Sequence, residues 1–319
     1  MEGDMKHWME GEITVFIKIW LSIYFSLSYC FFIAKTAPIG LPRLLLFLPV
    51  ISLFLLIPLA LHSVHLCGIT AFFISWLGNF KLLMLAFNNG PLPSLSLPHF
   101  LVIACLPIKI HQKHTDSSIS SSNNAHSAQQ DLNIILAIVA ALARAVLSLE
   151  LEPTFNEPYL SASLQDFWGS RWNLMVNRIL RPAVYSPFYD VSDKYLGRKW
   201  ATYPAVIATF MVSGLMHELI YFYLGRVRPT WEITWFFLLH GACVAVEITL
   251  KKALRDRCRL PGILGTILTL GFVTLTVCWL FLPQLLRCKA LVRALAEYAA
   301  LGAFVKDVGI ALTLGARSS

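Results

Sequence analysis

The chain has 319 residues, of which 57% are hydrophobic and only 14% are charged, and its mean hydropathy is +0.65. Soluble domains average about 45–50% apolar and about 25% charged residues, so this composition excludes an ordinary soluble domain and indicates an all-α, polytopic membrane protein. The net charge of +8 comes from basic residues between apolar stretches. These residues do not form the basic and aromatic clusters that would indicate nucleic-acid binding.

Apolar stretches long enough to cross a bilayer, which takes about 20 residues, recur along the chain. They lie at roughly 13–34, 41–61, 64–87, 132–149, 203–224, 231–250 and 263–286, with weaker stretches at roughly 97–108 and 290–315. We therefore expect a bundle of about seven to nine transmembrane helices. The first stretch follows acidic residues and lacks the positive start and cleavage site of a secretory signal, so we expect it to be a retained helix.

A serine-rich polar segment, 109–131, separates two regions of different character. Such a segment buries too little apolar surface to become ordered, so it is predicted to be a flexible loop. It divides an N-terminal transmembrane scaffold, 1–108, from a predicted catalytic region, 132–319. The loop holds His111 and Asp116 in the HxxxxD pattern of soluble-type glycerolipid acyltransferases. A catalytic pair needs rigid surroundings, so we exclude this pair as the active site.

The stretch 156–181 is rich in tryptophan and polar residues. If it is one helix, Asp166 and Asn173 are seven residues apart and share a face. Trp168 and Trp172 would then stack along another face. One interpretation is an amphipathic helix at the membrane surface, with tryptophan at the headgroup level and arginine reaching phosphate. The functional interpretation rests on Asn173, because an uncharged amide can polarise a carbonyl or orient a substrate hydroxyl.

The strongest functional candidate is His217, which lies inside one of the predicted spans. Ionisable side chains at this depth are costly and usually face a protein interior or a cavity. Ser213 and Tyr221 lie one turn away on the same face, and Gly214 leaves room for a ligand. A neutral histidine can take a proton from an alcohol as a general base; the alternative is a polar anchor between helices. Glu218 points about 100° away around the helix, so we expect it to pair with a basic or hydroxyl group.

His240 and Glu247 share a face of the next predicted span. We expect them to have a supporting role, with hydrogen bonds across the bundle to the helix of His217. The seven cysteines of the chain are scattered and include no CxxC pair. Neither a zinc site nor a disulfide framework is indicated, so we expect no metal.

Charge between the spans predicts how the chain crosses the membrane. The basic groups at 178–199 and 251–259 flank two consecutive spans, and the positive-inside rule puts both groups on the cytosolic side. These spans would then form a hairpin that goes out and back. Arg226 and Arg228 in its lumenal turn argue weakly against this topology. The basic groups are explained equally well by topology with contact to anionic lipid and by a role in holding a phosphorylated substrate.

Two stretches, 156–183 and 213–247, resemble the membrane-bound O-acyltransferase superfamily, and more narrowly its plant wax-synthase branch. That branch contains long-chain-alcohol O-fatty-acyltransferases and the related acyl-CoA:sterol acyltransferases. The resemblance implies a helical bundle enclosing a catalytic tunnel, with His217 as general base. It also implies that Asn173, 44 residues earlier, is the polar residue of the upstream Phe167–Asn173 motif. This motif departs from that of sterol and diacylglycerol enzymes in the three residues after Trp168.

The same resemblance implies the rest of the site. We expect substrate-binding residues at Trp168, Arg171, Trp172, Ser213 and Tyr221, and supporting residues at Asp166, Glu218, His240 and Glu247. The implied reaction moves a fatty acyl group from acyl-CoA, the co-substrate, to a long-chain alcohol, without a metal or other cofactor. The expected partners are therefore acyl-CoA, a lipid alcohol and membrane lipids, with no nucleic acid, and the expected location is the endoplasmic reticulum membrane.

Several alternatives stay open at this point. A sterol or a diacylglycerol would present one hydroxyl to the same base, so the acceptor is not fixed by these residues. A transporter would carry ionisable residues on several spans, whereas the spans before residue 150 carry few. An inactive scaffold is disfavoured because His217 and Asn173 are both present. The alanine-rich end, 290–319, leaves open a shortened or weakly active enzyme.

Overall fold

The computed structural model describes residues 2–106, 108–109, 150–151, 154–254, 261–299 and 302. Within these residues, six helical segments are long and apolar enough to cross a membrane: Glu10–Thr36, Leu41–Ala60, Val64–Ala86, Thr202–Gly225, Glu232–Leu254 and Gly262–Arg287. The predicted all-α class is confirmed, because the strands β1 (Ile108–Lys109) and β2 (Glu150–Leu151) in this part of the chain are single two-residue segments paired antiparallel.

Six of the expected spans coincide with these helices to within a few residues. The weaker stretch 97–108 forms only α5 (Leu97–Cys105), whose 9 residues are too few to cross a bilayer. The predicted span 132–149, most of 290–315, and the loop with His111 and Asp116 lie outside the described residues.

The N-terminal part is a bundle of helices. It comprises α1 (Glu2–Thr36), α2 (Leu41–Leu56), the 3₁₀ turn η1 (Ile57–Ala60), α3 (Val64–Thr70), the π-helical η2 (Ala71–Gly78), α4 (Asn79–Ala86) and α5. Phe47, Phe54 and Phe100 are fully buried between these helices. Tyr223 of α10 (Thr202–Gly225) belongs to the same core, so this bundle packs against the second half of the chain.

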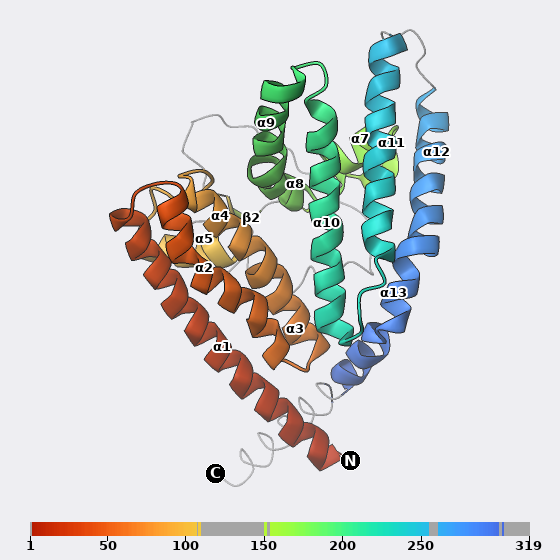
Figure 1. Ribbon diagram of the computed structural model, residues 1–319. Helices are drawn as coiled ribbons and strands as arrows, with labels where there is room; N and C mark the ends of the chain where they lie inside the picture. Colours follow the sequence, from red (N-terminus) through yellow and green to blue (C-terminus); the bar gives the residue numbers. More distant parts are fainter. Residues whose placement is uncertain are drawn as a thin grey trace.

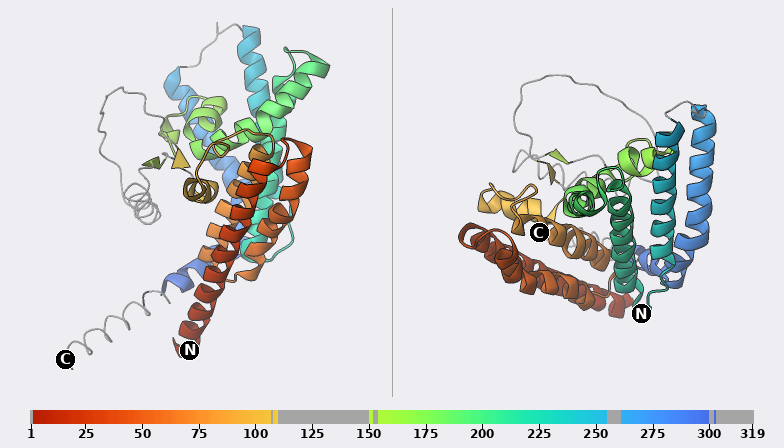
Figure 2. Two further views of the ribbon diagram at one scale, coloured as in Figure 1. Left: turned by 90° about the vertical axis from the view of Figure 1, so that its left-hand side faces the viewer. Right: turned by 45° about the horizontal axis from the view of Figure 1, so that its top comes forward.

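The second half begins with short, broken helices: η3 (Pro158–Leu160), α7 (Leu164–Asp166), η4 (Phe167–Arg171), α8 (Leu174–Leu180), η5 (Arg181–Tyr185) and α9 (Ser186–Leu196). Long helices follow: α10 (Thr202–Gly225), α11 (Glu232–Leu254) and α12 (Gly262–Thr276), continued by η6 (Val277–Phe281) and α13 (Leu282–Arg287). Figure 1 shows α1–α5 on one side and α10–α12 on the other, with α8 and α9 beside the upper half of α10. The views in Figure 2 show that the broken helices lie at one end of this arrangement.

The hairpin of α10 and α11 is held together by small residues. A Cβ added at Gly214 of α10 would lie 2.9 Å from the Thr234 Cα, and one added at Gly241 of α11 would lie 2.9 Å from the Phe210 Cβ. Small residues let membrane helices approach closely. The hairpin therefore depends on glycine at these two contacts, one on each helix.

The carboxylate of Glu297 joins the C-terminal helix 290–299 to the start of α3. Glu297, in the helix 290–299, accepts hydrogen bonds from the backbone N–H of Val64 at 2.6 Å and from the Ser63 hydroxyl at 2.8 Å. It also accepts from the backbone and the ring of His65. Burial raises the pKa of Glu297, but these donors outweigh burial and hold the pKa below its usual value. The carboxylate thus fixes the start of α3 in its ionised form.

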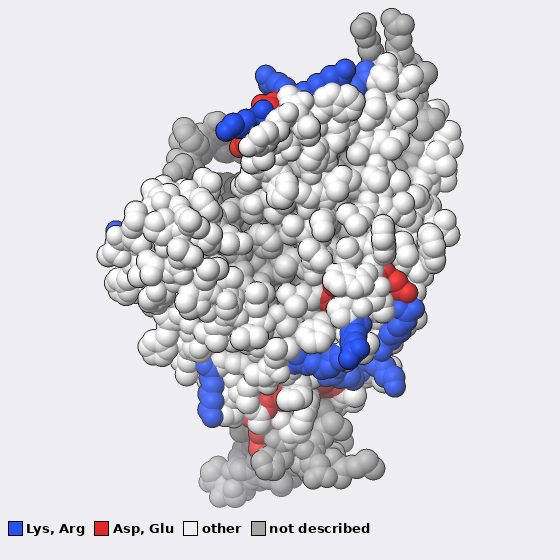
Figure 3. Space-filling model, in the orientation of Figure 1, with Lys and Arg blue, Asp and Glu red and all other residues white. Residues whose placement is uncertain are grey.

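Charged side chains gather at the two ends of the molecule, with a broad band free of them between (Figure 3). α10 begins and α11 ends at the same end. The described parts of the two basic groups, around 178–199 and at 251–254, therefore share one end, as the predicted hairpin requires.

Candidate active site

The tryptophan-rich stretch is not the single helix that its spacing predicts. Ser163 starts α7, and its hydroxyl accepts from the backbone N–H of Asp166 at 3.2 Å. A wide π turn follows and ends at Arg171, Trp172 is extended, and Asn173 has left-handed backbone angles (φ 44°, ψ 62°). Asparagine tolerates this conformation and also starts helices. Its Oδ1 accepts from the backbone N–H of Val176 at 3.3 Å, which begins α8.

Two predictions from helical spacing are therefore wrong. Asp166 and Asn173 lie in different helices, so they do not share a face. Trp172 stacks on Phe167, with ring centroids 5.3 Å apart, and not on Trp168. The helix breaks at Trp172 because the side chain of Asn173 provides a new N-cap.

Asp166 and Arg171 close this broken turn. The Arg171 Nε lies 2.7 Å from the Asp166 Oδ2, and the Ser170 hydroxyl donates to Oδ1 at 2.6 Å. Burial raises the pKa of Asp166, but the hydrogen bonds from Ser170 and Arg171 outweigh it and hold the pKa below its usual value. Arg171 also donates to the Glu157 carbonyl at 3.2 Å and does not line the cavity described next. The structure therefore places Arg171 in the turn beside the cavity and not in its lining.

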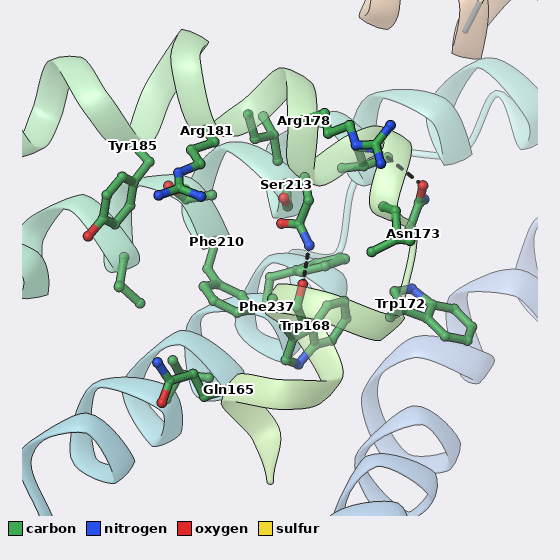
Figure 4. Close-up of a pocket in the computed structure, with 18 of the residues that line it drawn as sticks. Gln165, Trp168, Trp172, Asn173, Arg178, Arg181, Tyr185, Phe210, Ser213 and Phe237 are labelled. Carbon is green, nitrogen blue, oxygen red and sulfur yellow. Dashed lines mark hydrogen bonds between the residues drawn. The ribbon is translucent and has the colours of Figure 1, made fainter. Parts of the chain in front are cut away.

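A cavity of about 570 Å³ lies between the broken helices, α10 and α11 (Figure 4). Along α10 its lining follows one face: Thr202, Val206, Thr209, Phe210, Ser213 and His217. From Thr202 to His217 a helix rises about 22 Å, so the cavity runs from the basic end of the hairpin to a depth well inside the membrane-spanning region. Its walls are mostly apolar, and Phe237 and Val244 of α11 form part of them.

His217 lies at the deep end of this cavity. Its Nδ1 is 2.7 Å from the Ser213 carbonyl oxygen. A carbonyl can only accept, so Nδ1 carries the hydrogen and Nε2 keeps a lone pair. Within the described part of the chain no hydrogen bond engages Nε2, and the ring is enclosed by Phe237 and Phe281, with centroids 4.6 and 5.8 Å away. The imidazole is thus oriented by its own helix, with a basic nitrogen available.

Asn173 and Asn177 line the same cavity. The Oδ1 of Asn173 is occupied by the helix cap, which leaves its amide NH₂ as the group able to donate to a ligand. Asn177, which the sequence analysis missed, donates through Nδ2 to the Trp168 carbonyl. The signal was present, because Asn177 lies one turn after Asn173 and so on the same face of α8.

Trp168 is fixed by a directional chain of hydrogen bonds. Its indole N–H donates to the Nδ1 of His240 at 3.0 Å, so the Nε2–H of His240 donates to the Thr276 hydroxyl at 2.8 Å. That hydroxyl in turn donates to the Phe272 carbonyl at 2.8 Å. His240 is fully buried and supports Trp168, a wall of the cavity. Its supporting role agrees with the prediction, but its partner is Trp168 and not the helix of His217.

The remaining predicted residues lie around the site. Trp172 and Ser213 line the cavity. Tyr221 does not line it and packs against Phe281, with centroids 5.8 Å apart, so the structure does not bring this predicted residue to the cavity. Glu247 lies 2.6 Å from the Nζ of Lys251 and accepts a hydrogen bond from the backbone N–H of Gln165. Neither contact involves His240.

Glu218 is buried but faces away from the cavity. Its Oε1 accepts from the backbone N–H of Thr234 at 3.3 Å. The carboxyl therefore meets the first turn of α11 at Thr234. Orphan N–H groups and the helix dipole make such an end favourable for a carboxylate.

Cationic side chains also line the cavity. Arg178 of α8 and Arg181 of η5 lie on the same side of it as Tyr185, and Gln165 lies apart from them (Figure 4). We call the part of the wall that holds the two arginines the cationic mouth. The two arginines belong to the basic group at 178–199, for which a role in holding a phosphorylated substrate was left open beside topology. Among the described residues no cluster of three His, Cys, Asp or Glu side chains is arranged to hold a metal ion. The site thus offers a base at depth, an amide donor, apolar walls and a cationic mouth.

Comparison with known proteins matches residues 151–239 to the membrane bound O-acyl transferase family, and this segment contains both Asn173 and His217. Acyl-CoA–sterol O-acyltransferase 1 of Arabidopsis thaliana is 47% identical over 93% of this chain and 98% of its own length. The long-chain-alcohol O-fatty-acyltransferase of Simmondsia chinensis is 42% identical over 91% of this chain and 95% of its own. No solved structure matches the chain.

Proposed function

The chain belongs to the membrane-bound O-acyltransferase family, and from this premise we propose that it transfers a fatty acyl group from acyl-CoA to a long-chain alcohol, giving a wax ester. The observation that supports this most directly is the imidazole of His217. Its Nδ1 is held by the Ser213 carbonyl, and its Nε2 is free at the deep end of an apolar cavity. A neutral base in an apolar cavity can take the proton of an uncharged lipid alcohol, whose oxygen then acts as the nucleophile.

In the proposed reaction the Nε2 of His217 takes the proton of the alcohol while the alcohol oxygen attacks the thioester carbonyl carbon. The carbon–sulfur bond then breaks, and the leaving thiolate of coenzyme A receives the proton from the imidazolium. The products are the ester and coenzyme A, so atoms and charge balance without a metal or covalent intermediate. General-base assistance of this kind contributes about 10²–10⁴ in rate; holding both substrates in the cavity supplies much of the rest.

The Nδ2 hydrogens of Asn173 are the proposed donors to the thioester oxygen, where negative charge develops during attack. Arg178 and Arg181 at the cationic mouth suit the phosphates of coenzyme A. Their place at the end of the hairpin with the basic groups fits entry of acyl-CoA from the cytosol. The alcohol, which is dissolved in the bilayer, would reach His217 from the membrane. We propose that this membrane is the endoplasmic reticulum.

A sterol is the second candidate acceptor. The relative of 47% identity is named as a sterol acyltransferase, whereas the Simmondsia relative is named for long-chain alcohols. Both relatives are covered almost completely, so identity alone does not separate the two acceptors. A sterol ring system is rigid and wide, whereas an alkyl chain is narrow and flexible, so the shape of the cavity decides between them.

The test is lipid profiling of a yeast that lacks its own neutral-lipid acyltransferases and expresses this chain, with and without added fatty alcohol. Wax esters that depend on the chain and on added alcohol are the expected result. Steryl esters without wax esters would show that the acceptor is a sterol. Acylated glycerides without wax esters would show that it is diacylglycerol. If no ester forms while the protein is present in endoplasmic reticulum membranes, the proposed activity is wrong.

A further inference from the structure

A second hollow of about 440 Å³ lies on the outer side of the α10–α11 hairpin, away from the catalytic cavity. We call it the outer groove, and it is lined by Leu196, Trp200, Tyr203, Pro204, Ala245, Val246 and Thr249. None of these residues lines the catalytic cavity, which uses the adjacent positions Thr202, Val206, Val244 and Ile248. The two hollows therefore flank the same end of the hairpin.

The lining of the outer groove is apolar and open to the surroundings. Leu196, Trp200 and Val246 are each more than half exposed, at 56%, 55% and 57%. Trp200 lies two residues before the start of α10, near the end of a span, where tryptophan often meets lipid headgroups in membrane proteins. The groove is thus at the depth where acyl chains end and headgroups begin.

Two lysines stand at the rim of the outer groove. The Nζ of Lys199 lies 5.6 Å from the ring centroid of Trp200, and the Nζ of Lys252 lies 5.4 Å from that of Tyr203. Among the described carboxylates none forms a salt bridge with either lysine. Basic side chains gather at this end of the face shown in Figure 3. An apolar groove with cations at its rim matches an anionic phospholipid, whose phosphate meets the lysines while one acyl chain lies in the groove.

We propose that the outer groove binds an anionic phospholipid of the surrounding leaflet, through Lys199 and Lys252 at the headgroup and Trp200, Ala245 and Val246 at the acyl chain. A zwitterionic lipid fits the apolar part equally well but gains less from the lysines, because its headgroup carries no net charge. The proposal does not depend on which alcohol is acylated.

The experiment uses the full chain in bilayer nanodiscs that contain a trace of phosphatidylserine with a photoactivatable acyl chain. Parallel nanodiscs contain phosphatidylcholine with the same chain, and labelled peptides are identified by mass spectrometry. We expect phosphatidylserine to label segments 196–204 and 245–249 severalfold more than phosphatidylcholine does. Lys199→Gln or Lys252→Gln should each reduce this preference about fivefold. Arg228→Gln, which removes an exposed cation at the other end of the hairpin, is the matched control and should leave the preference unchanged.

A second variant tests the acyl-chain part independently of charge. Ala245→Phe would fill the groove and keep both lysines, so labelling of 245–249 by either lipid should fall while the protein remains folded in the nanodisc. Equal labelling by the two lipids, or labelling spread evenly over the spans, would overturn the proposal. So would a lack of labelling of these segments by either lipid, which would show that no acyl chain enters the groove.

Discussion

The double use of Asn173 gives a prediction that separates catalysis from structure. Its Oδ1 caps α8, its backbone is left-handed, and its Nδ2 is the proposed donor to the thioester oxygen. Asn173→Asp keeps an oxygen for the cap and a residue that tolerates φ > 0, but removes the NH₂ donor. We expect stability close to that of the parent and turnover lowered about 10²–10³-fold, the usual effect of losing one oxyanion donor.

Two further substitutions at this position complete the series. Asn173→Gly loses the donor and the cap but fits the left-handed backbone, so it should cost only a few tenths of a kcal/mol relative to the parent and still lose turnover. Asn173→Ala loses the helix cap and the donor and adds backbone strain. We expect it to lower the free energy of unfolding by about 2 kcal/mol. The assay is ester formation from acyl-CoA and alcohol in microsomes, together with thermal unfolding in detergent. Parental turnover in Asn173→Asp would remove the amide from the mechanism, and loss of activity that followed stability through the series would make Asn173 a structural residue only.

The other predictions concern the base and two structural contacts. His217→Gln should lower turnover about 10²–10⁴-fold with little change in the amount of membrane-inserted protein; near-normal ester formation in microsomes would contradict the proposed base. Gly214→Ala should destabilise the hairpin by about 1–3 kcal/mol, because its Cβ would lie 2.9 Å from the Thr234 Cα, whereas Gly169→Ala, with no neighbour within 4 Å, is the control for thermal unfolding. Glu297→Gln should destabilise at neutral pH, since the pKa of Glu297 is held below its usual 4.5. The parent's advantage should be complete above that value and disappear as pH falls below it, and a pH-independent difference in unfolding temperature would refute this explanation.

The sequence was most informative where one residue type carries the chemistry by itself. His217 stood out because an ionisable side chain inside an apolar span needs a reason, and the cavity beside it provides that reason. The helices α10 and α11 and the segment Gly262–Arg287, which comprises α12, η6 and α13, were also predicted to within a few residues, because apolar length alone determines a transmembrane helix. Gly214 was expected to make room for a ligand, but the space beside it is filled by Thr234 of the next helix.

The residues around Asn173 show where sequence reasoning fails. Spacing arguments assume an unbroken helix, and here the assumption fails within one residue, at Trp172. The competing effect is local: an asparagine side chain that caps the next helix stabilises the break. The partner of His240 was missed for a different reason, because it is set by which elements meet in space. Trp168 lies 72 positions before His240 in the chain, and no periodicity connects them.

The acceptor at the Nδ1 of His217 affects how well the protonated ring is stabilised. In the Ser-His-Asp arrangement a carboxylate accepts the Nδ1–H and stabilises the imidazolium that forms. Here the acceptor is the uncharged Ser213 carbonyl, and Glu218 is directed to the start of α11. The imidazolium is therefore not paired with a negative charge at Nδ1, and an apolar cavity makes a lone cation costly. The proton should accordingly pass to the leaving thiolate soon after it is taken from the alcohol, which favours a reaction in which both transfers occur within one closed site. An alcohol bound without acyl-CoA should then remain protonated, because no acidic side chain is among the described residues that line the cavity.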